Sequence, residues 1–247
     1  MDLFGSDGSD DSDGEEVPRP EACGVLQFHN GTESELLRVV AAEAERGDSA
    51  AVLATIDRFC RSRHWMMHVG DVKGAILRGT ARAAAPGLWV ELGAYCGYSA
   101  VLLASQMQSG MLVSLDTEAR CVAWSRQLVE HAGLSERVKV MQSSPDETAA
   151  EALAREIPSP QIQLLFIDHA KDRYLADLVA LEPYLAEGCV VVADNVLCFD
   201  GGASLKPYLE HVRDTSRYAS STLHKAPVEY SDGEPDGVEV SVFRGVT

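Results

Sequence analysis

The chain has 247 residues, of which 46% are hydrophobic, and a formal net charge of −17 at pH 7. This length suits one α/β domain with an extension, and no apolar run approaches the roughly 20 residues that span a bilayer. Nucleic-acid ligands are disfavoured, because phosphate backbones are bound by clustered Lys and Arg that this acidic chain does not show. We therefore expect a small neutral or cationic substrate, with neither nucleic acid nor membrane as a partner.

The N-terminal segment is acidic and rich in Ser and Gly, and it lacks the basic start and apolar core of a secretory signal. We predict a disordered tail and linker over residues 1–28, because so few apolar side chains cannot offset the entropy of ordering. The tail is either a solubilising extension or a docking segment for an unidentified partner. The six cysteines form no C-x-x-C pair, which indicates reduced thiols and a cytoplasmic protein.

The single domain is expected over residues 29–247 and begins with a helical preface. Two helical patterns lie between Thr32 and Arg63 and are separated at Gly47-Asp48. A third helix is predicted from Asp71, a plausible N-cap, to the neighbourhood of Pro86-Gly87.

Short apolar runs alternate with helical patterns through the rest of the chain. The five runs are Leu88–Leu92, Met111–Leu115, Val138–Met141, Ile162–Ile167 and Cys189–Ala193. Buried parallel strands have such continuous Val/Ile/Leu runs, so we predict an α/β fold with a Rossmann-like, doubly wound, mostly parallel sheet and helices on both faces. Tyr218–Leu223 and Val238–Phe243 are predicted to form a terminal antiparallel hairpin.

A glycine-containing loop follows the first predicted strand, in Glu91-Leu92-Gly93-Ala94-Tyr95-Cys96-Gly97-Tyr98-Ser99. Asp116 ends the second strand about 20 residues on, where an acid typically hydrogen-bonds ribose hydroxyls. The loop lacks the G-x-G-x-x-G pattern of dinucleotide sites, so an adenosine ligand without a pyrophosphate is favoured over a nicotinamide cofactor. A glycine turn that only connects strand to helix is the alternative.

Oxygen-bearing side chains end the fourth and fifth predicted strands. Asp168 follows the fourth strand, and Asp194 and Asn195 follow the fifth. If the two strands are neighbours, these side chains converge at one edge of the sheet, and hard oxygen ligands suit Mg²⁺. Asp and Asn also cap helices that follow strands, and the spacing supports both interpretations equally.

Lys171 lies three residues after Asp168. The ammonium form of a lysine is disfavoured beside a bound dication, so Lys171 could act as a general base. A solvated surface lysine is the alternative.

Four motifs resemble those of the catechol O-methyltransferase family in order and approximate spacing, within roughly residues 57–244. They are Gly70-Asp71-Val72-Lys73-Gly74, the segment from Glu91 to Ser99, Asp168-His169-Ala170-Lys171-Asp172-Arg173-Tyr174 and Ala193-Asp194-Asn195-Val196. The resemblance implies that S-adenosylmethionine donates a methyl group to a hydroxyl of a catechol-type small molecule in the presence of Mg²⁺.

The resemblance also assigns roles to individual residues. It implies Asp168, Asp194 and Asn195 as magnesium ligands, Lys171 as the base and Glu229 as the partner of the second catechol hydroxyl. The implied cofactor-binding residues are Met67, Val69, Glu91, Gly93, Tyr95, Ser99, Asp116, Asp146 and Asp168. The implied substrate pocket contains Trp65, Ala170, Lys171, Asn195, Phe199 and Glu229. For Trp65 and Met67 taken alone, ordinary core packing is the simpler interpretation.

The chain departs from the family pattern at several positions around the pocket. Ala170 and Phe199 stand where well-known members have a tryptophan and a proline, and Pro145 and Asp146 replace a serine and a glutamine near the adenine. These departures bear on adenine and substrate contacts and leave the reaction type unchanged. A methyltransferase of another phenol, an amine or a protein side chain is the first alternative, and a non-catalytic interaction module is the second.

Overall fold

The computed structural model describes residues 30–198 and 200–245. The tail predicted for residues 1–28 and the pocket residue Phe199 therefore lie outside the described residues. In the described part of the chain, no helix combines the length and the apolar character needed to cross a membrane.

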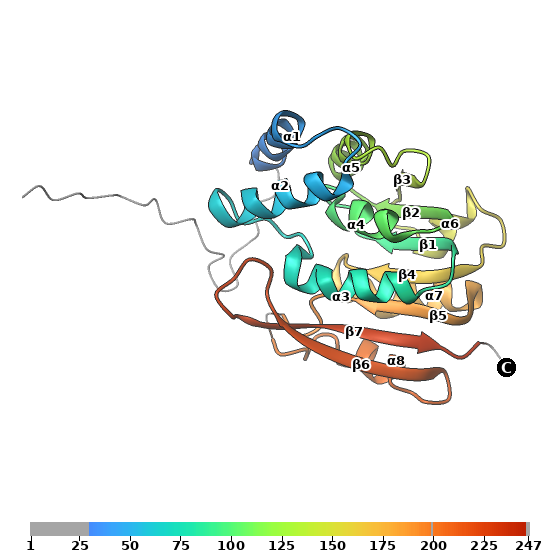
Figure 1. The fold of residues 1–247 in the computed structure, drawn as a ribbon. Helices are drawn as coiled ribbons and strands as arrows, with labels where there is room; N and C mark the ends of the chain where they lie inside the picture. Colours follow the sequence, from blue (N-terminus) through green and yellow to red (C-terminus); the bar gives the residue numbers. More distant parts are fainter. Residues whose placement is uncertain (1–29, 199, 246–247) are drawn as a thin grey trace, which may run out of the picture.

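A seven-stranded sheet forms the centre of the fold (Figure 1). Its strands are β1 (Gly87–Leu92), β2 (Gly110–Asp116), β3 (Val138–Gln142), β4 (Ile162–Ile167), β5 (Leu185–Ala193), β6 (Tyr218–Pro227) and β7 (Pro235–Phe243). Their order is β3-β2-β1-β4-β5-β7-β6, in which the first five strands are parallel and β7 runs antiparallel to both β5 and β6. The predicted doubly wound sheet with a terminal hairpin is confirmed.

Eight α-helices of the described residues surround this sheet (Figure 1). They are α1 (Thr32–Glu43), α2 (Ser49–Ser62), α3 (Gly70–Ala83), α4 (Tyr98–Gln106), α5 (Ala119–His131), α6 (Ala149–Ala154), α7 (Tyr174–Leu181) and α8 (Lys206–Val212). Two 3-10 turns, η1 (Lys171–Arg173) and η2 (Glu182–Tyr184), flank α7.

The helical preface has the predicted break, but its third helix begins earlier than predicted. Asp48 caps α2 by accepting the backbone N–H groups of Ala50 and Ala51. Asp71 is not an N-cap, because α3 already begins at Gly70. The Asp71 carboxylate instead lies in the first helical turn and forms an ion pair with Arg61 at 2.6 Å.

Alternate side chains of the strands pack against helices on opposite faces of the sheet. Trp89 of β1 belongs to the core that includes buried residues of α1 to α5, whereas Val90 and Leu92 belong to the core shared with α6, α7 and α8. Successive side chains of a strand point to opposite faces, so each central strand contributes to both cores. This explains why the central strands have continuous apolar sequences.

The sheet order places the carboxyl ends of β1 and β4 side by side, at the point where the order of strands reverses. Ligands of open α/β sheets bind at such a point. Gly93 directly follows β1 with φ +99°, and a Cβ atom built there would lie 2.2 Å from the backbone oxygen of Asp168. Only glycine fits this close approach, which brings the loop after β1 against the chain after β4.

Candidate active site

A cavity of about 850 Å³ lies at the carboxyl ends of the parallel strands. Twelve residues predicted from the sequence line it: Trp65, Met67, Val69, Gly93, Tyr95, Ser99, Asp116, Asp168, Ala170, Lys171, Asn195 and Glu229. The fold therefore brings together side chains that are up to 164 positions apart in the chain.

Asp116 shapes the glycine loop at one end of this cavity. Its Oδ2 atom accepts the backbone N–H groups of Ala94 and Tyr95, both at 3.0 Å. Its Oδ1 atom accepts the N–H of Glu118 at 2.9 Å. Since Oδ2 already accepts two hydrogen bonds, Oδ1 is the oxygen with remaining capacity for a ribose hydroxyl.

Glu91 is completely buried at the end of β1, and it is not part of the cavity wall. Burial raises the pKa of this carboxyl group to about 7, although a hydrogen bond from Ser114 opposes the shift. The Oε1 atom has no hydrogen-bond partner among the described residues. An unsatisfied buried acceptor is costly, and this oxygen has almost no exposed surface and does not face the cavity as described.

The aromatic rings of His68, Tyr98 and His169 line the cavity and were not among the predicted site residues. The ring of His68 stacks on Tyr98 with centroids 5.4 Å apart, and burial lowers the pKa of His68 to about 3. The imidazole is therefore neutral at physiological pH. The sequence gave no signal for the place of His68 in the cavity.

Lys171 is held between the ends of β4 and β5. Its Nζ atom lies 3.3 Å from Asp168 Oδ1, 3.2 Å from Asn195 Oδ1 and 2.6 Å from the hydroxyl oxygen of Tyr174. The Tyr174 hydroxyl donates its single proton to the backbone oxygen of Asp194, at 3.1 Å, so it accepts from Lys171. These contacts place the amine at the wall of the cavity and argue against a freely solvated lysine.

The three predicted magnesium ligands lie around the same two strand ends. Asp194 is 1% exposed, and neither of its carboxylate oxygens accepts a hydrogen bond from the described residues. Burial raises the pKa of both Asp168 and Asp194, which means that a nearby cation would stabilise their charged forms. The donor set, two carboxylates and one amide oxygen, fits Mg²⁺.

No group of three or more His, Cys, Asp or Glu side chains in residues 30–198 and 200–245 is arranged to hold a metal ion. The predicted set contains two such side chains, and its third ligand is the amide of Asn195. Asp194 accepts no hydrogen bond from the described residues, and Asp168 and Asn195 converge on Lys171, so these three side chains remain the candidate ligands for Mg²⁺.

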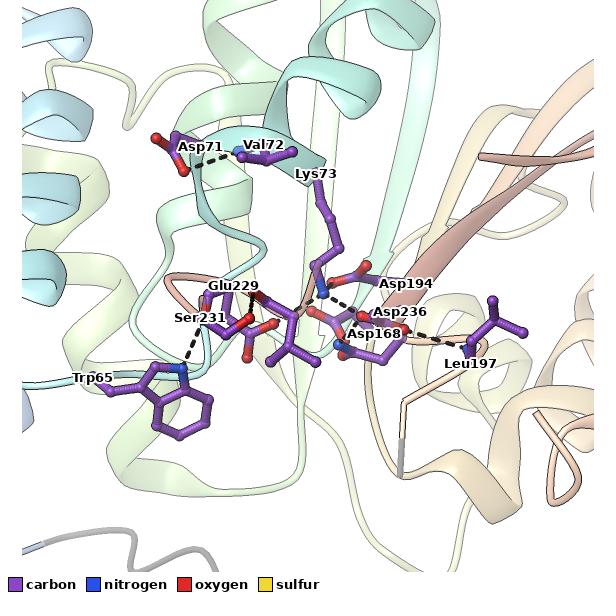
Figure 2. A network of polar contacts seen from close by, with 12 residues as sticks. Trp65, Asp71, Val72, Lys73, Asp168, Asp194, Leu197, Glu229, Ser231 and Asp236 are labelled. Carbon is purple, nitrogen blue, oxygen red and sulfur yellow. Dashed lines mark hydrogen bonds and ion pairs between the residues drawn. The ribbon is translucent and has the colours of Figure 1, made fainter. Parts of the chain in front are cut away.

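Lys73 forms a buried cationic centre behind this wall, which Figure 2 shows beside Asp194, Glu229 and Asp236. Its Nζ atom lies 2.9 Å from Asp194 Oδ2, 2.9 Å from Glu229 Oε2 and 2.8 Å from Asp236 Oδ2. The contacts to Glu229 and Asp236 are also hydrogen bonds, whereas the contact to Asp194 is an ion pair only. Burial opposes the charge on Lys73, but the surrounding carboxylates outweigh it and raise its pKa well above the usual value.

Glu229 lies on the connection between β6 and β7, next to the aromatic wall of the cavity. The indole N–H of Trp65 donates to the backbone oxygen of Glu229 at 2.9 Å (Figure 2). Gly70 packs against Glu229 so closely that a Cβ atom at position 70 would lie 2.9 Å from Glu229 Cβ. The preface and the terminal hairpin thus enclose the cavity from one side.

Three of the predicted site residues, Glu91, Asp146 and Asp194, do not line the cavity, and a fourth, Phe199, is not among the described residues. Asp146 is exposed and outside it, whereas its neighbours Pro145 and Glu147 line it. Asp194 lies buried behind the wall with Lys73, and Phe199 is outside the described residues. Lys73 belongs to the motif Gly70–Gly74, which predicted no role for it, and no sequence signal pointed to Asp236.

Comparison with known proteins identifies the family. The chain matches the methyltransferase-domain family over residues 90–196. It is 37% identical over 213 residues to catechol O-methyltransferase B of Danio rerio, covering 85% of this chain and 78% of that protein. It is 36% identical over 225 residues to catechol O-methyltransferase of Bos taurus, covering 90% of this chain and 80% of that protein.

Solved structures share the fold at lower sequence identity. The O-methyltransferase of Bacillus cereus in complex with SAH has a TM-score of 0.62 and 22% identity, over 89% of this chain and 94% of that one. The O-methyltransferase TomG of Streptomyces achromogenes in complex with SAM has a TM-score of 0.64 and 19% identity, over 86% of this chain and 96% of that one. With the curated relatives at 36–37% identity over most of its length, this chain belongs to the catechol O-methyltransferase family, and it is an S-adenosylmethionine-dependent O-methyltransferase.

Proposed function

We propose that the chain transfers a methyl group from S-adenosylmethionine to one hydroxyl of a catechol-type small molecule, with Mg²⁺ as a cofactor. The observation that carries the proposal is the arrangement around Lys171. Its amine contacts both Asp168 and Asn195, two of the three candidate magnesium ligands, at the wall of the 850 Å³ cavity. Two relatives that cover most of the chain are named catechol O-methyltransferases.

The glycine loop and Asp116 fit the donor molecule. The loop exposes backbone at the N-terminus of α4, and Asp116 keeps capacity on Oδ1 for a ribose hydroxyl. Ser99 lines the cavity where the methionine end of the cofactor is expected, and Glu91 is buried next to Ser99. These residues would hold S-adenosylmethionine, which would supply the methyl group.

Asp168, Asp194 and Asn195 would hold Mg²⁺ through their side-chain oxygens. When bound, Mg²⁺ lowers the pKa of hydroxyl groups that coordinate it, and S-adenosylmethionine supplies the methyl group. Glu229 hydrogen-bonds the catechol hydroxyl that is not methylated. Trp65 forms an aromatic wall beside that hydroxyl.

Lys171 acts as the general base. Its amine removes the proton of the reacting hydroxyl, and the oxygen forms a bond to the methyl carbon as the carbon–sulfur bond breaks. The products are the methyl ether and S-adenosylhomocysteine, and the proton on Lys171 returns to solvent. Positioning of oxygen and methyl near contact supplies much of the rate.

A methyl-transfer assay over catechols, simple phenols and amines, with and without chelator, tests the proposal. We expect methylation of catechols by mass spectrometry, its loss in excess EDTA and its recovery when Mg²⁺ is restored. Methylation of amines or simple phenols that persists in EDTA would instead assign a different acceptor.

We also propose that the protein acts in the cytoplasm. The cysteines in the described residues, Cys60, Cys96, Cys121, Cys189 and Cys198, are all free and buried. Reduced thiols of this kind are typical of cytosolic proteins.

A further inference from the structure

Asp236 is the residue that links the buried cluster to the candidate magnesium ligands. It is 1% exposed and lies near the start of β7. Its Oδ2 atom accepts from Lys73 Nζ at 2.8 Å and from Asn195 Nδ2 at 2.9 Å. Its Oδ1 atom accepts the backbone N–H of Leu197 at 3.3 Å (Figure 2).

These contacts select one of the two orientations of the Asn195 amide. With Nδ2 on Asp236, the amide oxygen of Asn195 faces Lys171, at 3.2 Å from its Nζ atom. The reversed amide would place two acceptors together at Asp236 and two donors together at Lys171. Both neighbours therefore favour the orientation in which the oxygen is directed toward the candidate metal ligands.

Lys73 fixes the Asp236 carboxylate, which determines the orientation of the Asn195 amide. The ammonium is fully buried and bonds Asp236 and Glu229 at once, so neither carboxylate can rotate without breaking a charged hydrogen bond. Asn195 itself has a left-handed backbone with φ 52°, which a side-chain hydrogen bond helps to maintain.

We propose that Asp236, held by Lys73, is a positioning residue that orients the amide oxygen of Asn195 toward the magnesium site. The proposal rests on the proposed function, in which Asn195 is a metal ligand. Partners that orient a metal ligand from behind typically affect metal affinity by 10- to 100-fold when they are removed.

The orientation can be measured without metal, because the chain contains only two asparagines, Asn30 and Asn195. Protein labelled with ¹⁵N on asparagine side chains gives two amide groups in an NMR spectrum, and Asn30 is exposed. We expect the Asn195 amide protons of the wild type to be shifted downfield and slow to exchange. In Asp236→Ala they should move toward the position of the exposed Asn30 amide.

Mn²⁺ binding, measured by calorimetry or electron paramagnetic resonance, provides the second readout. Asp236→Ala should weaken Mn²⁺ binding by roughly 10- to 100-fold. Asp236→Asn removes the same negative charge but retains an oxygen that can accept from Asn195, so it should recover most of the affinity. Equal losses in the two variants would show a purely electrostatic effect and would overturn the proposal.

Glu239→Gln is the matched control. Glu239 is also a fully buried carboxylate on β7, but it pairs with Arg213 at 2.8 Å, away from the cavity. The Glu239→Gln variant should leave the Asn195 amide signal and the Mn²⁺ affinity unchanged.

An unaltered amide signal in Asp236→Ala would refute the positioning role even if the protein binds Mn²⁺. A wild type that binds no Mn²⁺ would refute the metal dependence of the proposed function, and the amide signal would still decide the orientation.

Discussion

The charges around Lys73 are unequal, because three buried carboxylates face one ammonium. Removing a charge from water is costly unless it is paired, and the raised pKa of Asp194 reflects this cost. The carboxylates of the cluster exceed the ammonium by two charges. A dication beside Asp194 would offset that excess, which supports the proposed magnesium site on grounds independent of the family.

Lys171→Ala tests the role of the amine. We expect the turnover number to fall roughly 10²- to 10⁴-fold, the range for loss of a general base, whereas S-adenosylmethionine affinity by calorimetry should stay close to that of the wild type. Lys206→Ala is the control, since Lys206 is an exposed lysine on α8 whose side chain is 73% accessible. A turnover number that is unchanged in Lys171→Ala would return Lys171 to the role of a surface lysine.

Glu91 predicts a pH dependence of stability. Its pKa is raised from 4.5 in the unfolded chain to about 7 in the fold, so the folded state binds the extra proton between these values. The free energy of unfolding should therefore fall as pH rises through this window, by on the order of 3 kcal/mol for this group.

Urea unfolding of the wild type and of Glu91→Gln between pH 5 and pH 8 measures this contribution. The free energy of unfolding of Glu91→Gln, relative to that of the wild type, should increase as the pH rises, because the amide does not ionise. A constant difference across the range would mean that Glu91 titrates normally in the folded protein.

The residues that sequence reasoning located best are those that directly follow strands. Asp168, Asp194 and Asn195 could be placed together because parallel strands end at a common edge. The contact between Lys73 and Asp236 could not be predicted, because it joins positions 163 residues apart. It depends on how α3 packs against the terminal hairpin. No local pattern encodes such a contact.

Among the elements, the central strands were predicted more accurately than the outer ones. The predicted run Ile162–Ile167 coincides with β4, which is buried on both faces. β5 begins four residues earlier than predicted, and β6 extends to Pro227, because partly exposed segments such as Ala186–Gly188 lack a continuous apolar signal. Hydrogen bonding to neighbouring strands, and not hydrophobicity, determines the ends of these strands.

A hydrogen bond from Tyr230 to Asp57 holds the connection between β6 and β7. A Tyr→Phe substitution removes this bond and leaves the packing of the ring unchanged. The hydroxyls of Tyr230 and Tyr98 both donate to Asp57 Oδ1, each at 2.9 Å. Tyr230 directly follows Glu229 and has a left-handed backbone with φ 55°. This bond therefore fixes the segment that carries Glu229 to helix α2.

Tyr230→Phe should lower the free energy of unfolding by about 1 kcal/mol and raise KM for a catechol several-fold, with a smaller change in kcat. Tyr98→Phe removes an equivalent hydrogen bond from α4, which does not carry Glu229, and it keeps the ring that lines the cavity. It should lower stability by a similar amount and leave KM near the wild-type value. A similar rise in KM in both variants would indicate that Asp57, and not the connection, influences the substrate.

On the scale of the whole molecule, the order of strands separates two groups of residues. The glycine loop follows β1 and Asp116 ends β2, whereas Asp168, Asp194 and Asn195 follow β4 and β5. Gly93 joins the groups through its close approach to Asp168. Sequence reasoning could identify both groups, but the neighbouring positions of β1 and β4 come from the assembled sheet.

This separation predicts that loss of the metal and loss of the methyl donor have different effects on the protein. A ligand at about 100 times its Kd stabilises a folded protein by ~2.7 kcal/mol, which corresponds to a rise in Tm of roughly 5–10 °C for a chain of this size. S-adenosylmethionine should produce this shift both with Mg²⁺ and in excess EDTA, because the contacts proposed for it come mainly from the ends of β1 and β2. Methyl transfer should occur only with Mg²⁺. Asn195→Ala, in which a candidate metal ligand outside the donor site is lost, should resemble the EDTA-treated wild type in both measurements. A Tm shift that disappears together with activity in EDTA would show that donor binding requires the metal, and the two groups would then form one indivisible site.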